Sequence, residues 1–263
     1  MNGKARMTDI QRWPAEAIWQ ELEALLPGFS VEILPEIDST NTELMRRARA
    51  GRTEATLLVA EHQTAGRGRL GRDWRTARGD ALTFSLGLPL APRDWSGLSL
   101  VAGVAIAESL HPDLGLKWPN DLWWHDRKVG GILVETAGAG GADATRQVVV
   151  GVGLNIATPT LAEGLRTPPA GLRELSPGMR ATDALGAVVP ALARALLDFA
   201  AHGFAPWQTR FEARDVLRGR AVVLSDGREG TAASVDAQGV LQVRTADGWD
   251  AVRSADVSVR PAA

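Results

Sequence analysis

The chain has 263 residues, enough to bury one large core, alone or with a small second domain. Its apolar fraction of 45% is ordinary for a soluble globular protein, and the formal charge of −2 argues against broad electrostatic binding to nucleic acid. It contains no cysteine, which excludes disulfides, thiolate metal sites and a thiol nucleophile. The first ten residues lack the apolar segment of a signal peptide, and no apolar run is long enough to span a bilayer, so we expect a cytoplasmic protein.

In chain order, the pattern first predicts a helix over residues 14–26 and a strand over 31–37. A second helix is expected to begin near Ser39, which suits the N-cap position, and to end before Gly51. One helix ahead of the first strand is too little for a helix-turn-helix unit, so we expect no N-terminal DNA-binding domain.

Two apolar runs, 56–60 and 81–88, predict buried strands, and the segment between them is rich in glycine and arginine. Residues 66–72 hold three glycines, which let the backbone approach a ligand, and three arginines, whose rigid fork matches phosphate or carboxylate. This segment lacks the Gly-Lys-Ser/Thr of a Walker loop and the following helix of a dinucleotide fingerprint. Taken alone, it also suits a solvated turn or an Arg/Gly nucleic-acid segment.

The middle of the chain is predicted as a buried helix, a strand region interrupted by a proline, and two long strands, at 97–110, 116–124, 128–136 and 147–156. In the last of these, Gly151 and Gly153 are two residues apart and therefore face the same side of the sheet. Their missing side chains leave room either for a flat ligand or for a packed neighbour.

Residues 157–180 hold four prolines and are expected to form an irregular loop. A helix kinked at Pro190 is predicted over 182–201, and a shorter one over 207–214. From about Leu217 the pattern changes to short strands separated by Asp-Gly and Gln-Gly turns, which predicts a small β-barrel. The fold class is therefore α+β, with a mixed sheet packed against helices and a barrel at the C-terminal end.

Three polar clusters lie just past or between the apolar strands and could converge on one small ligand. Ser39-Thr40-Asn41 and Gln63 supply neutral donors and acceptors. Cations for a carboxylate and for phosphates come from Arg67, Arg69, Lys117 and Lys128. Asp121 is the anion that could hold Mg2+ or position a lysine. Each also has a purely structural explanation, such as capping a helix for Ser39 or an exposed hairpin position for Lys128.

Five segments together carry a family resemblance: Ile37-Asp38-Ser39-Thr40-Asn41, Gln63-Thr64-Ala65-Gly66-Arg67-Gly68-Arg69, Lys117-Trp118-Pro119-Asn120-Asp121, Lys128-Val129-Gly130-Gly131-Ile132-Leu133-Val134-Glu135 and Gly151-Val152-Gly153-Leu154-Asn155. In this order they resemble the motif set of biotin protein ligases, the biotin–acetyl-CoA-carboxylase ligases. The tail is similar to the SH3-like domain of that family. The resemblance implies a catalytic domain over residues 1–215 and an SH3-like domain over residues 216–263, in a single-function ligase that binds neither DNA nor membrane.

The resemblance implies a two-step reaction. Biotin and ATP form biotinyl-5′-AMP with the help of Mg2+, and biotin then passes to one lysine of a biotin carboxyl carrier protein, a subunit of acetyl-CoA carboxylase. A monomer or a homodimer is compatible with this reaction. Two alternatives stay open: a ligase for lipoate or another acyl group on the same fold, and a non-catalytic sensor of biotin or nucleotide.

By resemblance, biotin would be held by Ser39, Thr40, Asn41, Gln63, Arg67, Gly68, Arg69, Lys128, Gly151 and Gly153. ATP would be held by Arg67, Arg69, Arg72, Lys117, Asn120 and Asn155. Catalysis would involve Lys128, Asp121 and Arg69, with Asp121 also a ligand for the metal. Some family members stack an aromatic ring on adenine, but residues 156–206 contain no Trp or Tyr, so we expect adenine to rest on Leu161, Leu165 or Leu172.

Overall fold

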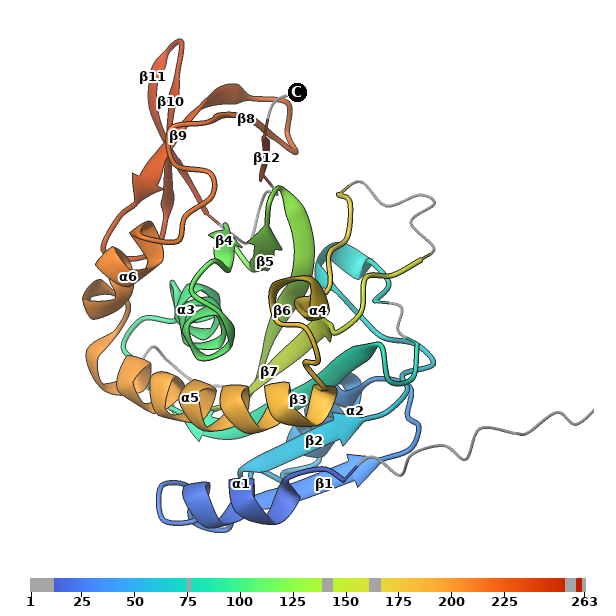
Figure 1. The fold of residues 1–263 in the computed structure, drawn as a ribbon. Coiled ribbons are helices and arrows are strands. Elements are labelled where there is room, and N and C mark those ends of the chain that lie inside the picture. The colour runs from blue at the N-terminus through green and yellow to red at the C-terminus, as the bar shows by residue number, and fades with distance from the viewer. Residues whose placement is uncertain (1–11, 75–76, 139–143, 161–166, 254–258, 262–263) are drawn as a thin grey trace, which may run out of the picture.

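The structure is a computed structural model that describes residues 12–74, 77–138, 144–160, 167–253 and 259–261. Within these ranges it forms a large sheet covered by helices and a smaller antiparallel sheet (Figure 1). The helices are α1 (Ala15–Leu22), α2 (Thr40–Arg49), α3 (Leu98–Leu110), α4 (Leu172–Leu175), α5 (Ala181–His202) and α6 (Gln208–Glu212). Two 3-10 turns are η1 (Arg69–Gly71) and η2 (Ala205–Trp207).

The large sheet has the order β1-β2-β3-β7-β6-β5-β4 among the described strands. Its strands are β1 (Ser30–Leu34), β2 (Thr56–Ala60), β3 (Ala81–Leu90), β4 (Gly115–Lys117), β5 (Asp121–Trp124), β6 (Arg127–Ala137) and β7 (Arg146–Asn155). β1 pairs with β2 in parallel and the other neighbours pair antiparallel, so the sheet is mixed, as predicted. The two positive-φ residues His125 and Asp126 form the tight turn between β5 and β6.

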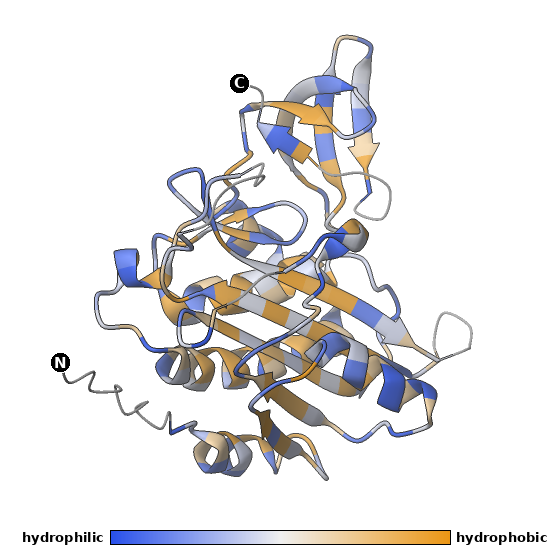
Figure 2. Cartoon of the chain, turned by 90° about the vertical axis from the view of Figure 1, so that its right-hand side faces the viewer, coloured by the Kyte–Doolittle hydropathy of each residue, from blue (hydrophilic) through white to orange (hydrophobic). Residues whose placement is uncertain are grey.

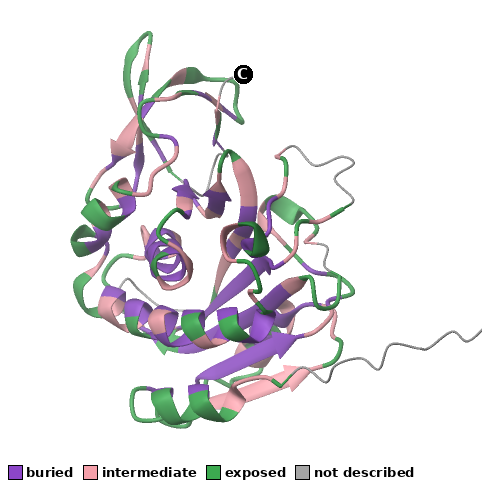
Figure 3. Cartoon of the chain, viewed as in Figure 1, coloured by how far each residue is buried: buried purple, intermediate pink, exposed green. Residues whose placement is uncertain are grey.

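Both faces of the sheet are covered, because successive residues of a strand point to opposite sides. In β2, Leu57 and Val59 enter the main core with α1, α3 and α5, whereas Leu58 packs with Leu44 of α2 on the other face. Figure 2 shows apolar residues concentrated on the strands and on the inward sides of the helices, and Figure 3 shows the same regions as buried. Among the described helices, α2 is the one that packs on the second face, which leaves part of that face for a site.

The expectation that no apolar run is long enough to span a bilayer was wrong for helix α5, the one described helix whose length and composition would allow it to cross a membrane. Its most apolar segment is 56% buried inside the protein, where the helix packs against α1, α3 and β3. Its apolar character is therefore explained by core packing. The helix continues on both sides of Pro190, which lies inside it.

The C-terminal sheet has the order β11-β10-β9-β8-β12 among the described strands, all antiparallel. These are β8 (Ala221–Leu224), β9 (Glu229–Val235), β10 (Leu241–Thr245), β11 (Gly248–Val252) and β12 (Val259–Pro261). One contact between this sheet and the preceding chain is at α6, where Gln208 Nε2 donates to the carbonyl of Val235 at 2.8 Å. The predicted change to short strands after Leu217 is confirmed.

Several predicted elements differ in extent; the strand predicted over 31–37, for example, is β1 and ends at Leu34. The first helix ends at Leu22, and turns occupy the rest of the predicted range. The region around Pro119 is two short antiparallel strands, β4 and β5, because proline has no N–H for a ladder and stands in the turn between them. The loop over 157–180 includes the short helix α4.

Candidate functional site

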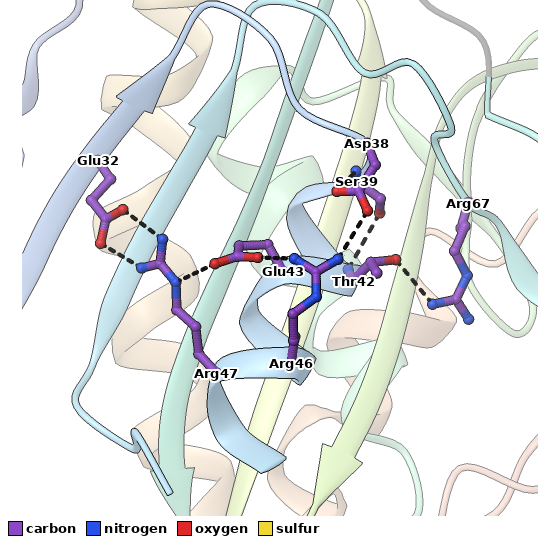
Figure 4. Close-up of polar contacts among 8 residues, drawn as sticks. All are labelled: Glu32, Asp38, Ser39, Thr42, Glu43, Arg46, Arg47 and Arg67. Atoms are coloured by element: carbon purple, nitrogen blue, oxygen red, sulfur yellow. Dashed lines mark hydrogen bonds and ion pairs between the residues drawn. The ribbon is translucent and has the colours of Figure 1, made fainter. Parts of the chain in front are cut away.

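An ion-pair network fixes the first turn of α2, which carries the first predicted cluster (Figure 4). Arg47 binds Glu32 of β1 at 2.6 Å and Glu43 at 2.8 Å, and Arg46 binds Asp38 at 3.1 Å. The Arg47 bond holds the pKa of Glu43 below its ordinary value. Arg47, in the last turn of α2, therefore links the helix to β1, and through Glu43 it connects this attachment to the first turn.

Buried neutral groups meet where this helix end faces the sheet. Gln63 Oε1 accepts from the main-chain N and the hydroxyl of Thr40, at 2.8 and 3.1 Å. Ser85 Oγ of β3 lies 2.7 Å from both Thr40 Oγ1 and Asn41 Oδ1. Ser39 caps α2, with its hydroxyl accepting from Thr42 N at 3.4 Å, so its structural role is confirmed. Amide and hydroxyl groups of this kind offer both donors and acceptors to a polar ligand.

Gly151 and Gly153 lie on the same face of β7, as predicted, but protein side chains already lie against them. A Cβ at Gly151 would come within 2.1 Å of Asn41 Oδ1, and one at Gly153 within 2.4 Å of the indole of Trp74. Trp74 follows the Arg/Gly segment and leaves its buried Nε1 without a hydrogen-bond partner among the described atoms. The floor of the site therefore consists of two glycines, an amide and an aromatic ring.

The Arg/Gly loop folds back on itself. Gly68 N donates to the Arg72 carbonyl at 2.7 Å, and Trp74 N donates to the Gly66 carbonyl at 2.8 Å. A side chain at Gly66 would lie 2.3 Å from the Trp74 carbonyl oxygen, so glycine is required there. This folding of the loop sets the directions of Arg67 and Arg69.

The loop arginines reach two different parts of the site. Arg67 pairs with Glu135 of β6 at 3.1 Å. It also donates to the Thr42 hydroxyl at 3.3 Å (Figure 4). Arg69 donates to Asn120 Oδ1 at 3.2 Å. Glu135 also accepts from Asn41 Nδ2 at 2.9 Å, which connects the neutral groups with the loop.

A cluster of cations surrounds the carboxylate of Asp121. Lys128 Nζ lies 2.7 Å from Asp121 Oδ1, and Lys117 Nζ lies 3.9 Å from Oδ2. Burial lowers the pKa of Lys117, and attraction to Asp121 opposes that shift. Repulsion by the neighbouring cations Lys128, Arg72 and Arg69 lowers the Lys117 pKa further. Lys128, Lys117 and Arg69 all interact with this one carboxylate, and Arg72 acts on Lys117 and Arg69 as a further nearby cation, so excess positive charge remains that favours a polyanion.

The glycine floor joins the cationic cluster to the neutral groups. Lys128 Nζ lies 5.7 Å from the Trp74 ring centroid, and a Cβ at Gly131 would meet the same ammonium at 3.2 Å. Asn120 Nδ2 donates to the Ile132 carbonyl at 2.8 Å. The predicted residues of all five motifs thus surround one face of the sheet.

Asn155 and the predicted adenine contacts lie differently. Asn155 Nδ2 donates to the carbonyls of Lys128 and Ala170, so this amide ties β7 to the backbone of β6. Leu172 is buried in the main core, whereas Leu161 and Leu165 lie outside the described residues. No group of three or more metal-ligating side chains occurs in the described part of the chain. A metal held here would rely on Asp121 and on oxygens of its ligand.

Sequence reasoning missed Ser85, Trp74 and a specific role for Glu135. Ser85 was visible only as one polar residue within the apolar run of β3. Trp74 gave no signal, because nothing local predicts that it packs on a strand far along the chain. Glu135 closed one of the quoted motifs, and its acidic side chain beside basic loops was the available signal.

Comparison with known proteins agrees with this geometry. The model of the biotin/lipoate A/B protein ligase family matches residues 33–155. The bifunctional ligase/repressor BirA of Escherichia coli is 37% identical over 226 residues, which cover 82% of this chain and 70% of BirA. The biotin–acetyl-CoA-carboxylase ligase of Paracoccus denitrificans is 32% identical over 245 residues, which cover 86% of this chain and 98% of that enzyme.

A solved structure shares the fold as well as the sequence. The Aquifex aeolicus biotin protein ligase in complex with biotin and ATP superposes with a TM-score of 0.74 at 28% identity, covering 88% of this chain and 99% of that one. The predicted fold class, a mixed sheet with helices and a C-terminal antiparallel sheet, is thereby confirmed. Because nearly the whole Paracoccus enzyme is matched and all five motifs converge on one face, the chain belongs to the biotin protein ligases of the biotin/lipoate A/B protein ligase family.

Proposed function

We propose that this chain is an ATP-dependent ligase that activates biotin as biotinyl-5′-AMP and transfers it to a specific lysine of a biotin carboxyl carrier protein. The observation that carries the proposal is the junction of two environments on one sheet face. Buried amides and hydroxyls around Asn41 adjoin a cationic cluster around Asp121. Such a junction suits a neutral ring that carries a carboxylate, placed beside a triphosphate.

In the first step a biotin carboxylate oxygen attacks the α-phosphorus of ATP. A P–O bond to biotin forms, the bond to the β-phosphate breaks, and pyrophosphate leaves with the electron pair. Two anions must approach each other, so fixed cations lower the barrier. Lys128 lies at the border of the two environments and would bind the carboxylate. Lys117, Arg69 and Arg72 would bind the phosphates.

In the second step the lysine amine of the carrier protein attacks the acyl carbon. A C–N bond forms, the C–O bond of the mixed anhydride breaks, AMP leaves with the bonding electrons, and the amine nitrogen releases one proton to solvent. Asp121 orients Lys128, and it also suits Mg2+, which commonly binds one or two carboxylates together with substrate phosphates. Bound Mg2+ would neutralise phosphate charge.

The neutral groups favour biotin over lipoate. A ureido ring has two N–H donors and a carbonyl acceptor, and it needs partners of both kinds when it is buried. The Thr40, Asn41, Gln63 and Ser85 groups supply both kinds. A dithiolane ring has neither an N–H nor a carbonyl, so it would gain no hydrogen bond from these groups, which in its presence would bond only to one another.

We propose that residues 1–215 form the catalytic domain and residues 216–263 the SH3-like domain, in a cytoplasmic monomer or homodimer that modifies the carrier subunit of acetyl-CoA carboxylase. The test is incubation with MgATP, a carrier-protein domain and either biotin or lipoate, followed by pyrophosphate measurement and a streptavidin blot. The proposal predicts biotin-dependent pyrophosphate release and a labelled carrier. Lipoylation would favour the other acyl ligase, and binding without pyrophosphate would favour a sensor.

A further inference from the structure

One hydrogen bond connects the C-terminal sheet directly to a motif of the site. Trp118 stands between Lys117 and the Asn120-Asp121 pair, and its side chain is 1% exposed. Its indole Nε1 donates to the carbonyl of Gly239 at 3.1 Å, across 121 residues of sequence. Gly239 lies in the turn between β9 and β10, outside the large domain.

The turn that carries this carbonyl is held rigidly. Asp236 Oδ1 accepts from the main-chain N of Gln238 at 2.9 Å and of Val240 at 3.0 Å. Gly239 N donates to the Asp236 carbonyl at 2.9 Å, and Gly239 has a φ of +76°, which favours glycine. The acceptor for Trp118 is therefore fixed within the turn.

The same turn is seated against the start of helix α3. A Cβ at Gly239 would lie 2.9 Å from Gly97 Cα and 3.0 Å from Leu100 Cδ1. Two residues into the helix, Ser99 Oγ donates to the Pro119 carbonyl at 2.9 Å. Helix α3 and the Gly239 turn thus contact each other and hold adjacent residues of one motif.

The segment from Lys117 to Asp121 is consequently held from three sides. Ser99 holds Pro119, the main-chain N of Ile132 donates to the Asn120 carbonyl at 2.9 Å, and Gly239 holds Trp118. The first two anchors belong to the large domain and the third does not. The segment presents the Lys117 ammonium and the Asp121 carboxylate to the cationic cluster.

We propose that Trp118 and the Gly239 carbonyl are positioning groups for ATP, through which the C-terminal sheet sets the place of Lys117, Asn120 and Asp121. The inference rests on the proposed adenylation reaction. The neutral groups that face biotin sit on α2, β3 and the loop after β2, away from this contact. Loss of the contact should therefore weaken ATP use much more than biotin binding, which Asp121 affects only through Lys128.

The test compares Trp118→Phe with Trp95→Phe in the full chain. Trp95 is a suitable control because its buried Nε1 has no hydrogen-bond partner among the described atoms, so the change removes similar ring area without a bond. The readouts are KM for ATP and kcat from biotin-dependent pyrophosphate release, with biotin affinity by calorimetry. We expect Trp118→Phe to raise the ATP KM about three- to tenfold, the effect of one lost hydrogen bond, and Trp95→Phe to stay within about twofold of wild type.

Gly239→Ala tests the contact from the other side, because the new methyl group must displace the turn from Gly97 and Leu100. The two changes act on one contact, so the double variant should be no worse than the more affected single variant. Equal loss of biotin affinity and ATP use, or an ATP KM for Trp118→Phe matching that of Trp95→Phe, would overturn the inference. A wild-type chain without biotin-dependent pyrophosphate release would instead overturn the proposed function.

Discussion

Lys128→Ala removes the ammonium group that lies between the buried neutral groups around Asn41 and the cationic cluster around Asp121. The Lys128 side chain is 29% exposed, and its ammonium lies 2.7 Å from the Asp121 carboxylate and near the Trp74 ring. The Lys117 ammonium lies farther from the same carboxylate, at 3.9 Å. A charge-assisted bond contributes about 1.5–3 kcal/mol, and about 1.4 kcal/mol corresponds to a factor of ten. We therefore expect kcat/KM for biotin-dependent pyrophosphate release to fall roughly ten- to a hundredfold.

The matched control is Arg127→Ala. It removes a cation one residue earlier on the same strand, where the guanidinium pairs with Glu174 at 2.6 Å outside the site. Pyrophosphate release is measured at varied biotin and fixed MgATP, and biotin affinity is measured by calorimetry. The control should stay within about twofold of wild type, since an exposed ion pair contributes little. Normal turnover and unchanged biotin affinity in Lys128→Ala would refute the assignment of Lys128 to the carboxylate.

Three further changes probe other parts of the account. Arg69→Gly removes the loop contact to Asn120 and gives the loop backbone more freedom, so the biotinyl-adenylate should form but leave the site early. A bystander protein such as albumin should then become biotinylated more than it does with the wild type. Intact adenylate synthesis without extra labelling would contradict this. A chain ending near residue 214 should keep its secondary structure by circular dichroism and lose affinity for ATP or the carrier protein more than for biotin; normal ligation would mean that the tail has no part in catalysis. Burial raises the pKa of Asp215 from 3.8 to about 6, so between these pH values the folded state holds a proton that the unfolded state has released, and the stability of the fold falls as pH rises. Thermal unfolding scans at pH 4.5 and 7.5 should show this fall for the wild type and not for Asp215→Asn. An equal fall in both proteins would contradict the prediction.

Much of the fold was predictable because local pattern decides it. The apolar runs of β2 and β3 require a sheet buried on both faces, and the Asp-Gly and Gln-Gly turns mark the short strands of the tail. Helix ends were harder to predict. The first helix was expected to reach residue 26, but hydrogen-bonded turns follow Leu22, and they bury the same apolar side chains that a longer helix would bury.

The candidate site was predictable where its residues fall in ordered motifs, and not where only packing brings them in. Trp74 reaches Gly153, and Trp118 reaches Gly239, across long separations that no periodicity encodes. Leu172 looked available for a ligand, but it is the apolar anchor of α4 in the core. The roles of the individual site residues stay predictions until substitutions test them.

The central claim is that one face of the sheet joins biotin to ATP and then to a lysine. The most direct measurement is intact-mass analysis of a carrier-protein domain after incubation with the full chain, biotin and MgATP, with pyrophosphate quantified in the same reaction. We predict one biotinyl group per carrier, on one lysine, and one pyrophosphate for each group transferred. An unmodified carrier, or pyrophosphate released equally without biotin, would contradict the account.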